Sequence, residues 1–596
     1  MPFFPTVPEI QQTQVVTNTF LGYNRNPEIG EGNNNVSPQS SLEFYDMKNL
    51  TSDYFPMLAN RKKRGIVKHL TSPGGLIAKE EIAYVDGGKL YYNEAEVVGL
   101  TLTEGQKQLV SMGAYLIIWP DKKYLNTKDL TDFGSIDTEV TVSGSISYSV
   151  CDGDAKEIEN IATTQPAEPA AGQYWLDKTT SPHSLKQFNA TTYTWVTIPT
   201  VYTKISASGI GAGFKKYDGV KITGVEYPGE SEDVKSQYDE LNGTKIIYSK
   251  GDNYIVVVGL IDVSSVQTKG TVTVSRCAPD MDYITEAGNR LWGCKYGIVD
   301  GKTINEIYAC SLGDFKNWNA FQGISTDSYA ASVGTDGKWT GAITHLGYPI
   351  FFKENVFHKV FVSSSGAHQI NDTACRGVQD GCSKSLAIVG ERLYYKSRSG
   401  IMMYDGSLPV CVSDAMGGEN YYDATAGAID DKYYVSMRDG SNAWHMFVLD
   451  ASKGLWHRED NTHSIGFTRS GNELYYIDAD TNEMKCVNGS VGDAEGTVEW
   501  QATTGIIGYT TVEQKYVSRF NIRMQLPKGS SADMYIQYDS DEVWHHCGHM
   551  EGVGTKSFML PVRPRRCDHF QIRIEGEGDV RVYSLSKIFE QGSDVS

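Results

Sequence analysis

The densest group of possible metal ligands in the sequence lies close to residue 550. His545, Cys547 and His549 alternate along a stretch predicted to be a strand, and residues two apart in a strand face the same side. Imidazole and thiolate are ligands that zinc prefers, so these three side chains could converge on one cation. The stretch lacks the paired Cys-x-x-Cys or His-Glu-x-x-His spacing of known zinc sites, which favours ordinary core and surface roles. We therefore predict no metal and no cofactor, and name these three residues as the candidates to test.

Two clusters of basic residues could contact phosphate groups or lie in an interface. Their members are Arg61, Lys62, Lys63 and Arg64 in the first cluster and Arg563, Arg565 and Arg566 in the second. The chain has 73 acidic and 54 basic residues, a formal net charge of −19, which argues against a broad phosphate-binding surface. We expect both clusters to form salt bridges at an interface or a solvated edge. They are also the residues most able to lie close to DNA, without binding it strongly.

Four aromatic side chains in the middle of the chain could stack on sugar rings. They are Tyr174, Trp175, Tyr193 and Trp195. Flat aromatic faces suit such stacking, but the same rings could equally form the small core of the segment that carries them. The sequence leaves both interpretations open and favours the core.

No motif of a known catalytic site is complete. The string Ser311, Asp314, Trp318 approaches the Asp-box turn of sialidases but lacks its spacing and its glycine, which favours a tryptophan packed under a turn. The glycine-rich segment 209–213 is followed by Phe214 and two lysines, without the Lys-Ser/Thr pair of a phosphate-binding loop. A Gly-x-Ser-x-Gly elbow does not occur. The sequence therefore predicts a protein that is not an enzyme.

A repeated unit of tyrosine-rich hairpins must position these residues. It begins near Ile82, Gln108, Ile284, Gly341, Ser385 and Ala426, with a shorter form from Ser464. Its second strand carries adjacent large rings, as in Tyr91-Tyr92, Phe351-Phe352, Tyr394-Tyr395, Tyr433-Tyr434 and Tyr475-Tyr476. Adjacent strand residues face opposite sides, so both faces of these sheets should be covered, as they are between the blades of a propeller. The repeat of roughly 40 residues predicts an all-β fold with a β-propeller of about six or seven blades.

Composition divides the chain into five predicted parts. Residues 1–60 form an extended docking segment, 61–135 the first part of the propeller and 276–496 its second part. Residues 136–275 form a β insertion domain with an acidic, Ala- and Pro-rich linker, and 497–596 a C-terminal β-sandwich with clean apolar-polar alternation. Exposed loops at 152–172 and 228–239 are further candidate contacts.

Cysteine usage and hydropathy indicate the compartment. The ten cysteines are scattered, with none closer than Cys375 and Cys382, so reduced thiols are expected. The longest apolar run, 254–263, includes Asp262 and is about half the roughly 20 residues needed to span a bilayer. The first residues lack a basic and apolar leader. We expect synthesis in the cytoplasm and no membrane span.

Several segments resemble virion proteins of tailed bacteriophages and of prophages in Gram-positive bacteria. These segments are GYNRNPEIGEGNNNVSPQSSLEFYDMKNLTSDYFPMLANRKKRG, NRLWGCKYG, IYACSLGDFKNW and LPVRPRRCDHFQIRIEGEGDVRVYSLS. The chain is most similar to the tail-hub, or nozzle, proteins of short-tailed phages, also called packaged-DNA stabilisation proteins. The resemblance implies a propeller-based fold, a homo-oligomeric ring, commonly a hexamer, and a place at the outer end of the DNA-exit channel.

The same resemblance implies the partners. They would be an upstream tail adaptor or portal complex, tail fibres or other distal tail proteins, and double-stranded DNA in transient passage, all in the virion tail. An acidic lumen would repel the duplex on every side and so reduce friction. The alternative function is a glycan-binding receptor-recognition module, a tail lectin or adhesin on a propeller scaffold, and a third is a glycan-degrading propeller enzyme.

Overall fold

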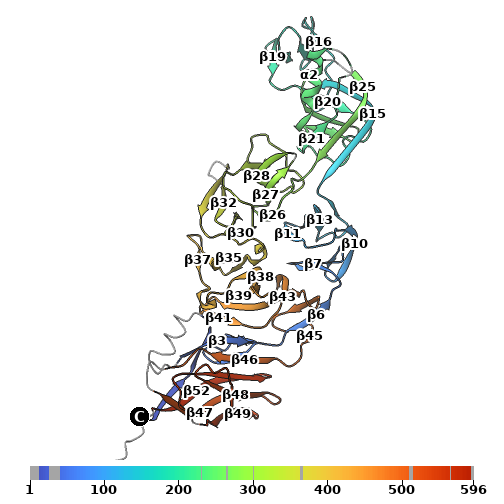
Figure 1. Cartoon of the computed structure of the whole chain (residues 1–596). Helices are drawn as coiled ribbons and strands as arrows, with labels where there is room; N and C mark the ends of the chain where they lie inside the picture. Colours follow the sequence, from blue (N-terminus) through green and yellow to red (C-terminus); the bar gives the residue numbers. More distant parts are fainter. Residues whose placement is uncertain are drawn as a thin grey trace, which may run out of the picture. The chain divides into compact units, whose positions relative to one another are not determined.

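The structure is a computed structural model of a chain built almost wholly from β-strands (Figure 1). It describes residues 12–25, 41–227, 229, 231–262, 266–299, 301–362, 367–508, 514–563 and 565–591. The chain divides into two compact units. The first comprises Met1–Lys107, Ile350–His358 and Asp372–Ser596, and the second Gln108–Pro349 and Lys359–Asn371. The all-β class predicted from the sequence is confirmed.

Four-stranded antiparallel sheets recur in the first unit, each made of strands consecutive in the sequence. Each buries apolar residues on its central strands, as the hairpin repeat requires. The strands are β7 (Pro73–Lys79), β8 (Glu81–Asp86), β9 (Lys89–Tyr92) and β10 (Ala95–Thr101); β34 (Ala387–Val389), β35 (Arg392–Ser397), β36 (Gly400–Tyr404) and β37 (Val410–Cys411); and β38 (Tyr421–Ile429), β39 (Lys432–Asp439), β40 (Trp444–Asp450) and β41 (Leu455–Arg458).

The last sheet of the repeat is completed by a strand from the start of the chain. It contains β42 (Ser464–Ser470), β43 (Glu473–Asp478), β44 (Glu483–Cys486), β6 (Gly65–His69) and β45 (Asp493–Ala494). Strand β6, which directly precedes the first sheet, pairs antiparallel with β44, with Gly65 opposite Cys486. The first and last repeats are thereby tied together by backbone hydrogen bonds.

The second unit has sheets of the same kind. They are formed by β11 (Gln108–Met112), β12 (Tyr115–Trp119), β13 (Lys123–Asn126) and β14 (Phe133–Ser135), and by β26 (Tyr283–Ala287), β27 (Arg290–Val299), β28 (Lys302–Ala309) and β29 (Tyr329–Ser332). Ile117, Trp119, Ile284 and Leu291 belong to one buried cluster, so these two sheets share a core. One more sheet, which belongs wholly to neither unit, consists of β30 (Gly341–His345), β31 (Tyr348–Phe352), β32 (Val356–Val362) and β33 (His368–Ala374).

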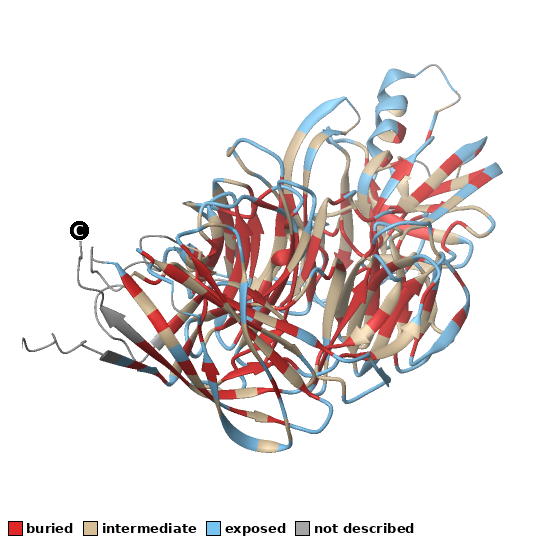
Figure 2. Ribbon diagram, turned by 60° about the horizontal axis from the view of Figure 1, so that its bottom comes forward, coloured by how far each residue is buried: buried red, intermediate tan, exposed pale blue. Residues whose placement is uncertain are grey.

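The paired rings of the second strands lie as the repeat predicts. Both members are buried in Phe351-Phe352, Tyr394-Tyr395, Tyr433-Tyr434 and Tyr475-Tyr476, while Tyr92 is buried and Tyr91 is half-buried. Both faces of these strands are therefore covered, and Figure 2 shows the buried residues following the strands. Closure of the seven sheets around one axis stays a prediction.

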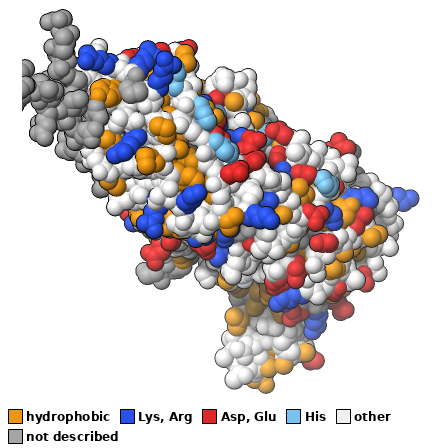
Figure 3. Space-filling view, turned by 90° about the horizontal axis from the view of Figure 1, so that it is seen from below, with side chains coloured by type: hydrophobic (Ala, Val, Ile, Leu, Met, Phe, Trp, Pro, Cys, Tyr) orange, Lys and Arg blue, Asp and Glu red, His pale blue; other side chains and the backbone are white. Residues whose placement is uncertain are grey.

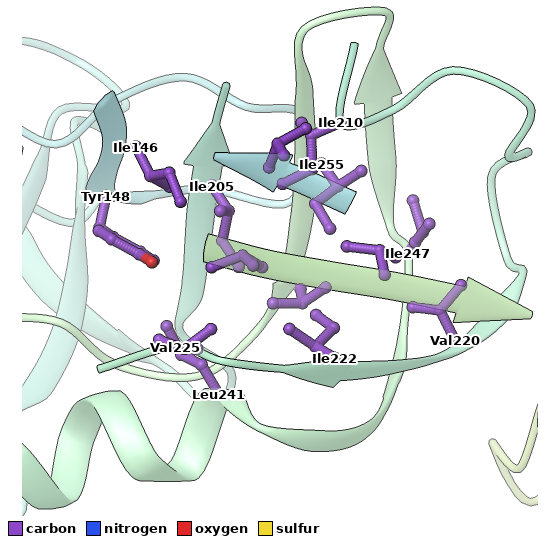
Figure 4. Packing of buried hydrophobic residues seen from close by; sticks show 14 of the residues in the cluster. Ile146, Tyr148, Ile205, Ile210, Val220, Ile222, Val225, Leu241, Ile247 and Ile255 are labelled. Carbon is purple, nitrogen blue, oxygen red and sulfur yellow. The ribbon is translucent and has the colours of Figure 1, made fainter. Parts of the chain in front are cut away.

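The insertion begins and ends on two paired strands, β15 (Thr138–Cys151) and β25 (Val266–Arg276), with Thr138 opposite Arg276. They are central in a seven-stranded sheet of order β22-β21-β25-β15-β20-β24-β23. The other strands of this sheet are β20 (Tyr202–Ser206), β21 (Gly219–Thr223), β22 (Gly243–Ile246), β23 (Ser249–Gly251) and β24 (Tyr254–Val258). Figure 4 shows Ile146, Ile205 and Ile222 pointing into its core.

One contact candidate of the insertion differs from its expected form. Most of the segment 228–239, expected to be an exposed loop, lies in helix α2 (Glu232–Leu241), while residues 228 and 230 are outside the described residues. Tyr238 and Leu241 are three residues apart, so they share one face of the helix, and both are buried in the core of the insertion. This packing stabilises a helix that the polar composition of the segment did not indicate.

Among the residues that the structure describes, none form a helix with the length and apolar character of a membrane span.

The C-terminal strands form two further sheets in the first unit. One has the order β4 (Leu50–Thr51), β5 (Leu58–Asn60), β52, β47 and β50, with β1 (Gln12–Thr17) paired to β52. The other has the order β2 (Thr19–Tyr23), β3 (Ser41–Lys48), β46, β51, β48 and β49. The strands are β46 (Glu499–Thr504), β47 (Lys515–Leu526), β48 (Ser531–Tyr538), β49 (His545–Glu551), β50 (Gly554–Pro561), β51 (Phe570–Glu577) and β52 (Arg581–Gln591). Alternate residues of β47 and β48 are buried, as a two-sheet sandwich requires.

The described parts of the predicted docking segment, residues 1–60, lie in strands of the C-terminal sheets, while residues 1–11 and 26–40 are outside the described residues. The segment supplies β1 (Gln12–Thr17), β2 (Thr19–Tyr23), β3 (Ser41–Lys48), β4 (Leu50–Thr51) and β5 (Leu58–Asn60) to the two C-terminal sheets. Phe20, Leu42 and Phe44 are too few to form a core alone, but each is buried once its strand joins a sheet that already has an apolar face.

Candidate functional site

A β-bulge separates the three metal-ligand candidates of β49. The pairing of β48 with β49 shifts register so that Tyr535 lies opposite His546 and Met534 opposite Gly548, which leaves Cys547 without a cross-strand partner. Strict alternation therefore fails, and His549 lies with His546 rather than with His545 and Cys547.

Asp533 is the residue that joins the two histidines. His546 Nε2 lies 2.8 Å from Asp533 Oδ1, and His549 Nδ1 lies 3.0 Å from Asp533 Oδ2. The hydrogen bond to this carboxylate raises the pKa of His549. Within the described ranges, no group of three or more His, Cys, Asp or Glu side chains is placed to hold a metal ion. The three candidates His545, Cys547 and His549 therefore do not share one face of the strand, and two of the histidines of this stretch bind Asp533 instead.

His545, His546 and Cys547 line a hollow beside β49. Its volume is about 320 Å³, and its lining consists of Ile536, Tyr538, His545, His546, Cys547, Val562, Arg563 and Arg565. The hollow therefore contains residues of both the histidine stretch and the second basic cluster, which the sequence had treated as separate features. Pairing of β48 with β49 places the histidines, and the segment that follows β50 brings the arginines.

Internal contacts hold the walls of this hollow in place. The Tyr538 hydroxyl donates to the carbonyl oxygen of Arg563 at 3.3 Å, and the Arg565 guanidinium lies 5.5 Å from the centre of the Tyr538 ring. Arg565 Nη1 also donates to Asp541 Oδ2 at 2.8 Å. Burial raises the pKa of the Cys547 thiol to about 12, so it stays protonated and is a poor nucleophile and a poor metal ligand.

The surface charge changes sign across this part of the C-terminal sheets. Arg563, Arg565 and Arg566 are exposed at one end, while Asp533 and Glu575 line a second hollow on the outer side of the same sheet. In Figure 3 histidine side chains lie between basic side chains and a group of acidic ones. The basic end is thus a local feature of an acidic chain.

The first basic cluster lies in a different environment from the one expected. Arg64 is 4% exposed, and its guanidinium lies 2.7 Å from Glu459 and 2.6 Å from Asp460. It also donates to Thr462 Oγ1 at 2.6 Å. Arg61 is buried as well and pairs with Glu495. The two guanidinium groups are therefore inside the unit instead of at its surface.

Arg61 and Arg64 are buried because of the strand that follows them in the sequence. Because β6 pairs with β44, the preceding residues are drawn against the acidic segment after β41. Lys62 and Lys63 point away and stay exposed. Only these two members of the cluster remain available as interface or DNA-proximal residues.

The aromatic candidates of the insertion lie on a second, small sheet. Its order is β16 (Ile161–Ala162), β17 (Tyr174–Asp177), β18 (Ser184–Asn189) and β19 (Thr194–Ile198). The ring centres of Trp175 and Trp195 are 5.4 Å apart, and Phe188 lies 5.4 Å from Trp195 and 6.1 Å from Tyr193. Tyr193, at the turn of the hairpin, is 83% exposed.

Tyr174 does not join this aromatic cluster. It packs on the opposite face of the sheet, against the buried residues Val150, Leu176 and Leu185. Trp175 is itself buried and donates its indole N–H to the carbonyl oxygen of Ala162 at 3.0 Å. The core interpretation therefore holds for Tyr174 and Trp175, whereas Tyr193 and part of Trp195 face outward. Phe188 was not among the sequence candidates, although it lies two residues from Lys186 and so shares the face of β18 on which Trp175 and Trp195 pack.

The Asp-box-like string is a packed turn. Trp318 is buried, and its indole N–H donates to the carbonyl oxygen of Phe315 at 2.8 Å. The backbone N–H of Asp314 donates to the carbonyl oxygen of Ser311 at 3.1 Å, which closes the turn. This is the structural role that the sequence favoured.

Comparisons with known proteins give distant similarity only. No family model matches the chain, and no curated protein matches it. Among solved structures, BamB from Moraxella catarrhalis is 9% identical over 75% of this chain and 97% of that chain, with a TM-score of 0.27. PorZ, a surface component of the type-IX secretion system of Porphyromonas gingivalis, is 12% identical over 87% of this chain and 77% of that chain, with a TM-score of 0.25. An exo-β-1,3-galactanase from Phanerochaete chrysosporium is 6% identical over 51% of this chain and 94% of that chain, with a TM-score of 0.20.

Proposed function

We propose that this chain is a structural protein of a bacteriophage tail, a ring-forming nozzle or hub that retains packaged DNA and conducts it during ejection. The observation that carries the proposal is the pairing of β6 with β44. A strand that precedes the first four-stranded sheet completes the last one, which is how a propeller is closed against opening. A closed scaffold with rings packed on both faces of its strands suits a part that must resist the pressure of a packaged genome.

The charge distribution supports passage of DNA without strong binding. The formal net charge is −19, and two of the four arginines and lysines of the first basic cluster are neutralised internally by Glu459, Asp460 and Glu495. Each phosphate contact adds to affinity, so fewer available cations mean less resistance to a moving duplex. The partners in this proposal are further copies in a ring, six by the family resemblance, with an adaptor or portal complex upstream and fibres or other tail proteins distally.

The test is a particle that lacks this protein. We expect such particles to package DNA and then lose it, and to regain retention when the purified chain is added back. Mass photometry and electron microscopy of the purified chain, alone and on particles, should find a ring. A chain that stays monomeric and never joins a particle would refute the proposal.

A second candidate function is glycan binding by the insertion. The observation that favours it is the aromatic cluster in which the mostly exposed Tyr193 and the half-buried Trp195 pack on the buried Phe188. Removal of an exposed aromatic side chain at a hairpin tip costs the protein little stability. Such a side chain is therefore not needed for folding, and its flat face is free to stack on a sugar ring.

Binding to a glycan array tests this alternative directly. Tyr193→Ala and Trp195→Ala should abolish any specific signal, whereas Val196→Ala, on the same strand but pointing to the other face, should leave it unchanged. If the wild-type chain gives no specific signal, the lectin alternative fails and the nozzle proposal is unaffected.

A further inference from the structure

We propose that the hollow beside β49 is a recognition pocket for a carboxylate side chain of an acidic segment of a partner protein. This inference concerns the isolated chain and does not depend on the nozzle assignment. It begins from the lining: Arg563, Arg565 and two histidines surround an opening whose inner wall is formed by Ile536 and Val562.

The cationic groups at the mouth define the sign of the ligand. Arg563 and Arg565 are exposed, always charged, and carry planar guanidinium groups that suit the two oxygens of a carboxylate. Arg565 already holds one carboxylate, that of Asp541, at 2.8 Å. A second carboxylate in the hollow would have Arg563 as well as Arg565 among the residues around it.

The apolar residues that line the hollow indicate which kind of chemical group carries the ligand's negative charge. Ile536 and Val562 are both buried, and burial holds the Cys547 thiol in its neutral form. An aliphatic stem gains from contact with such a surface, whereas a phosphate would have to lose its hydration there. A volume of about 320 Å³ fits one or two side chains. A glutamate, with a charged end on a short apolar stem, meets both requirements.

The surroundings argue for a protein segment over nucleic acid. The chain as a whole carries a formal charge of −19, and Asp533 and Asp541 bind the lining residues His546 and Arg565, so a polyanion would be repelled at long range. A single carboxylate needs only the two arginines that line the hollow, Arg563 and Arg565, to bind. Strand β49 is the last strand of its sheet, so the hollow opens at a sheet edge where a partner chain can approach.

The test uses the full-length chain and two fluorescent, N-acetylated peptides, one alternating valine with glutamate and one alternating valine with glutamine. Fluorescence anisotropy should find the glutamate peptide bound at least about tenfold more tightly, as expected for charge-assisted hydrogen bonds. Arg563→Gln should weaken its binding by about tenfold, and Arg565→Gln should do the same. Raising the salt concentration should weaken binding as well.

Lys556→Gln is the matched control. It removes one exposed positive charge from β50, in the same pair of sheets but outside the hollow, and should leave the affinity unchanged. Equal binding of both peptides, or equal loss with the Lys556 variant, would overturn the proposal. Stronger displacement of the glutamate peptide by inorganic phosphate than by acetate at the same concentration would overturn it in favour of a phosphate ligand. Thermal unfolding of each variant confirms that the exposed replacements leave the fold intact.

Discussion

At the residue scale, the buried arginines show how charge can stabilise the interior of an acidic protein. Burial alone would lower the pKa of Arg64, but Asp460, Tyr476 and Glu459 outweigh it and hold the guanidinium charged. Burial likewise raises the pKa of Asp460, and Arg64 and Arg61 more than compensate, so that the net shift is downward. Arg64 and Asp460 therefore stabilise each other's charged form.

Removal of Arg64 should therefore be costly. Arg64→Ala leaves Glu459 buried without its closest cation, and loss of one partner of a buried ion pair typically costs about 3–5 kcal/mol. Chemical denaturation should find this decrease in the free energy of unfolding. Lys62→Ala, two residues away and exposed, should change it by less than about 0.5 kcal/mol. Equal effects of the two variants would show that the cluster contributes nothing.

His457 makes stability depend on pH. It is buried in β41, and burial, followed by the nearby Lys432, lowers its pKa to about 3, partly opposed by Asp450 and Asp53. The unfolded chain has the ordinary value of about 6.5 and binds a proton first as the pH falls. The contribution of His457 is therefore complete above about pH 6.5 and is lost progressively as the pH falls toward 3.

The matching variant is His457→Gln, which keeps a neutral polar group. Between pH 7 and pH 5 the wild-type chain should lose more stability than this variant, by up to about 1.4 kcal/mol per pH unit below pH 6.5. Denaturation midpoints at several pH values measure the difference. Parallel pH profiles would indicate that His457 is not buried in its neutral form.

At the element scale, β6 is the strand on which the proposed closure depends. Gly65 at its start has no room for a side chain, because a Cβ there would lie 1.8 Å from the carbonyl oxygen of Val491 and 2.9 Å from Cys486 Sγ. The backbone of β6 therefore reaches β44 only with glycine at this position.

Gly65→Ala should push β6 away from its sheet. Overpacking of this kind costs about 1–3 kcal/mol, and hydrogen exchange of β6 and β44 should accelerate together. Gly466→Ala is the control, since Gly466 lies in β42 of the same sheet and a Cβ added there would meet nothing within 4 Å. A Gly65 variant as stable as the Gly466 variant would refute the role assigned to β6.

At the scale of the whole molecule, the insertion is an independent β module within its unit. It has its own core, and the residues on either side of it are close together, since the backbone N–H of Ala278 donates to Asp137 Oδ1 at 2.7 Å. A segment whose ends meet is removable with a short connection.

We expect a chain in which residues 138–276 are replaced by a four-residue Gly-Ser linker to fold and to form the same ring as the full-length chain. Arg276 and Asp218 are removed together, so neither is left behind as a buried charge without its partner, and Asn317 loses its two bonds to residues 217 and 219. Circular dichroism and mass photometry measure fold and assembly. Aggregation of the shortened chain would show that the insertion is an integral part of its unit.

The sequence by itself determined the kind of element and the faces it buries. Adjacent rings such as Tyr433 and Tyr434 predicted strands covered on both sides, because successive side chains of a strand point to opposite faces. Period-two alternation predicted the C-terminal sheets for the same reason. These are local properties, set by a few neighbouring residues.

Only the tertiary structure decided which distant residues meet. A bulge at Cys547 cannot be read from alternation, and it moved His549 to the side of Asp533. Pairing of β6 with β44 buried Arg61 and Arg64, and the course of the chain after β50 placed Arg563 beside His545. Such contacts depend on strand register and on partners hundreds of residues away, and no local pattern encodes either.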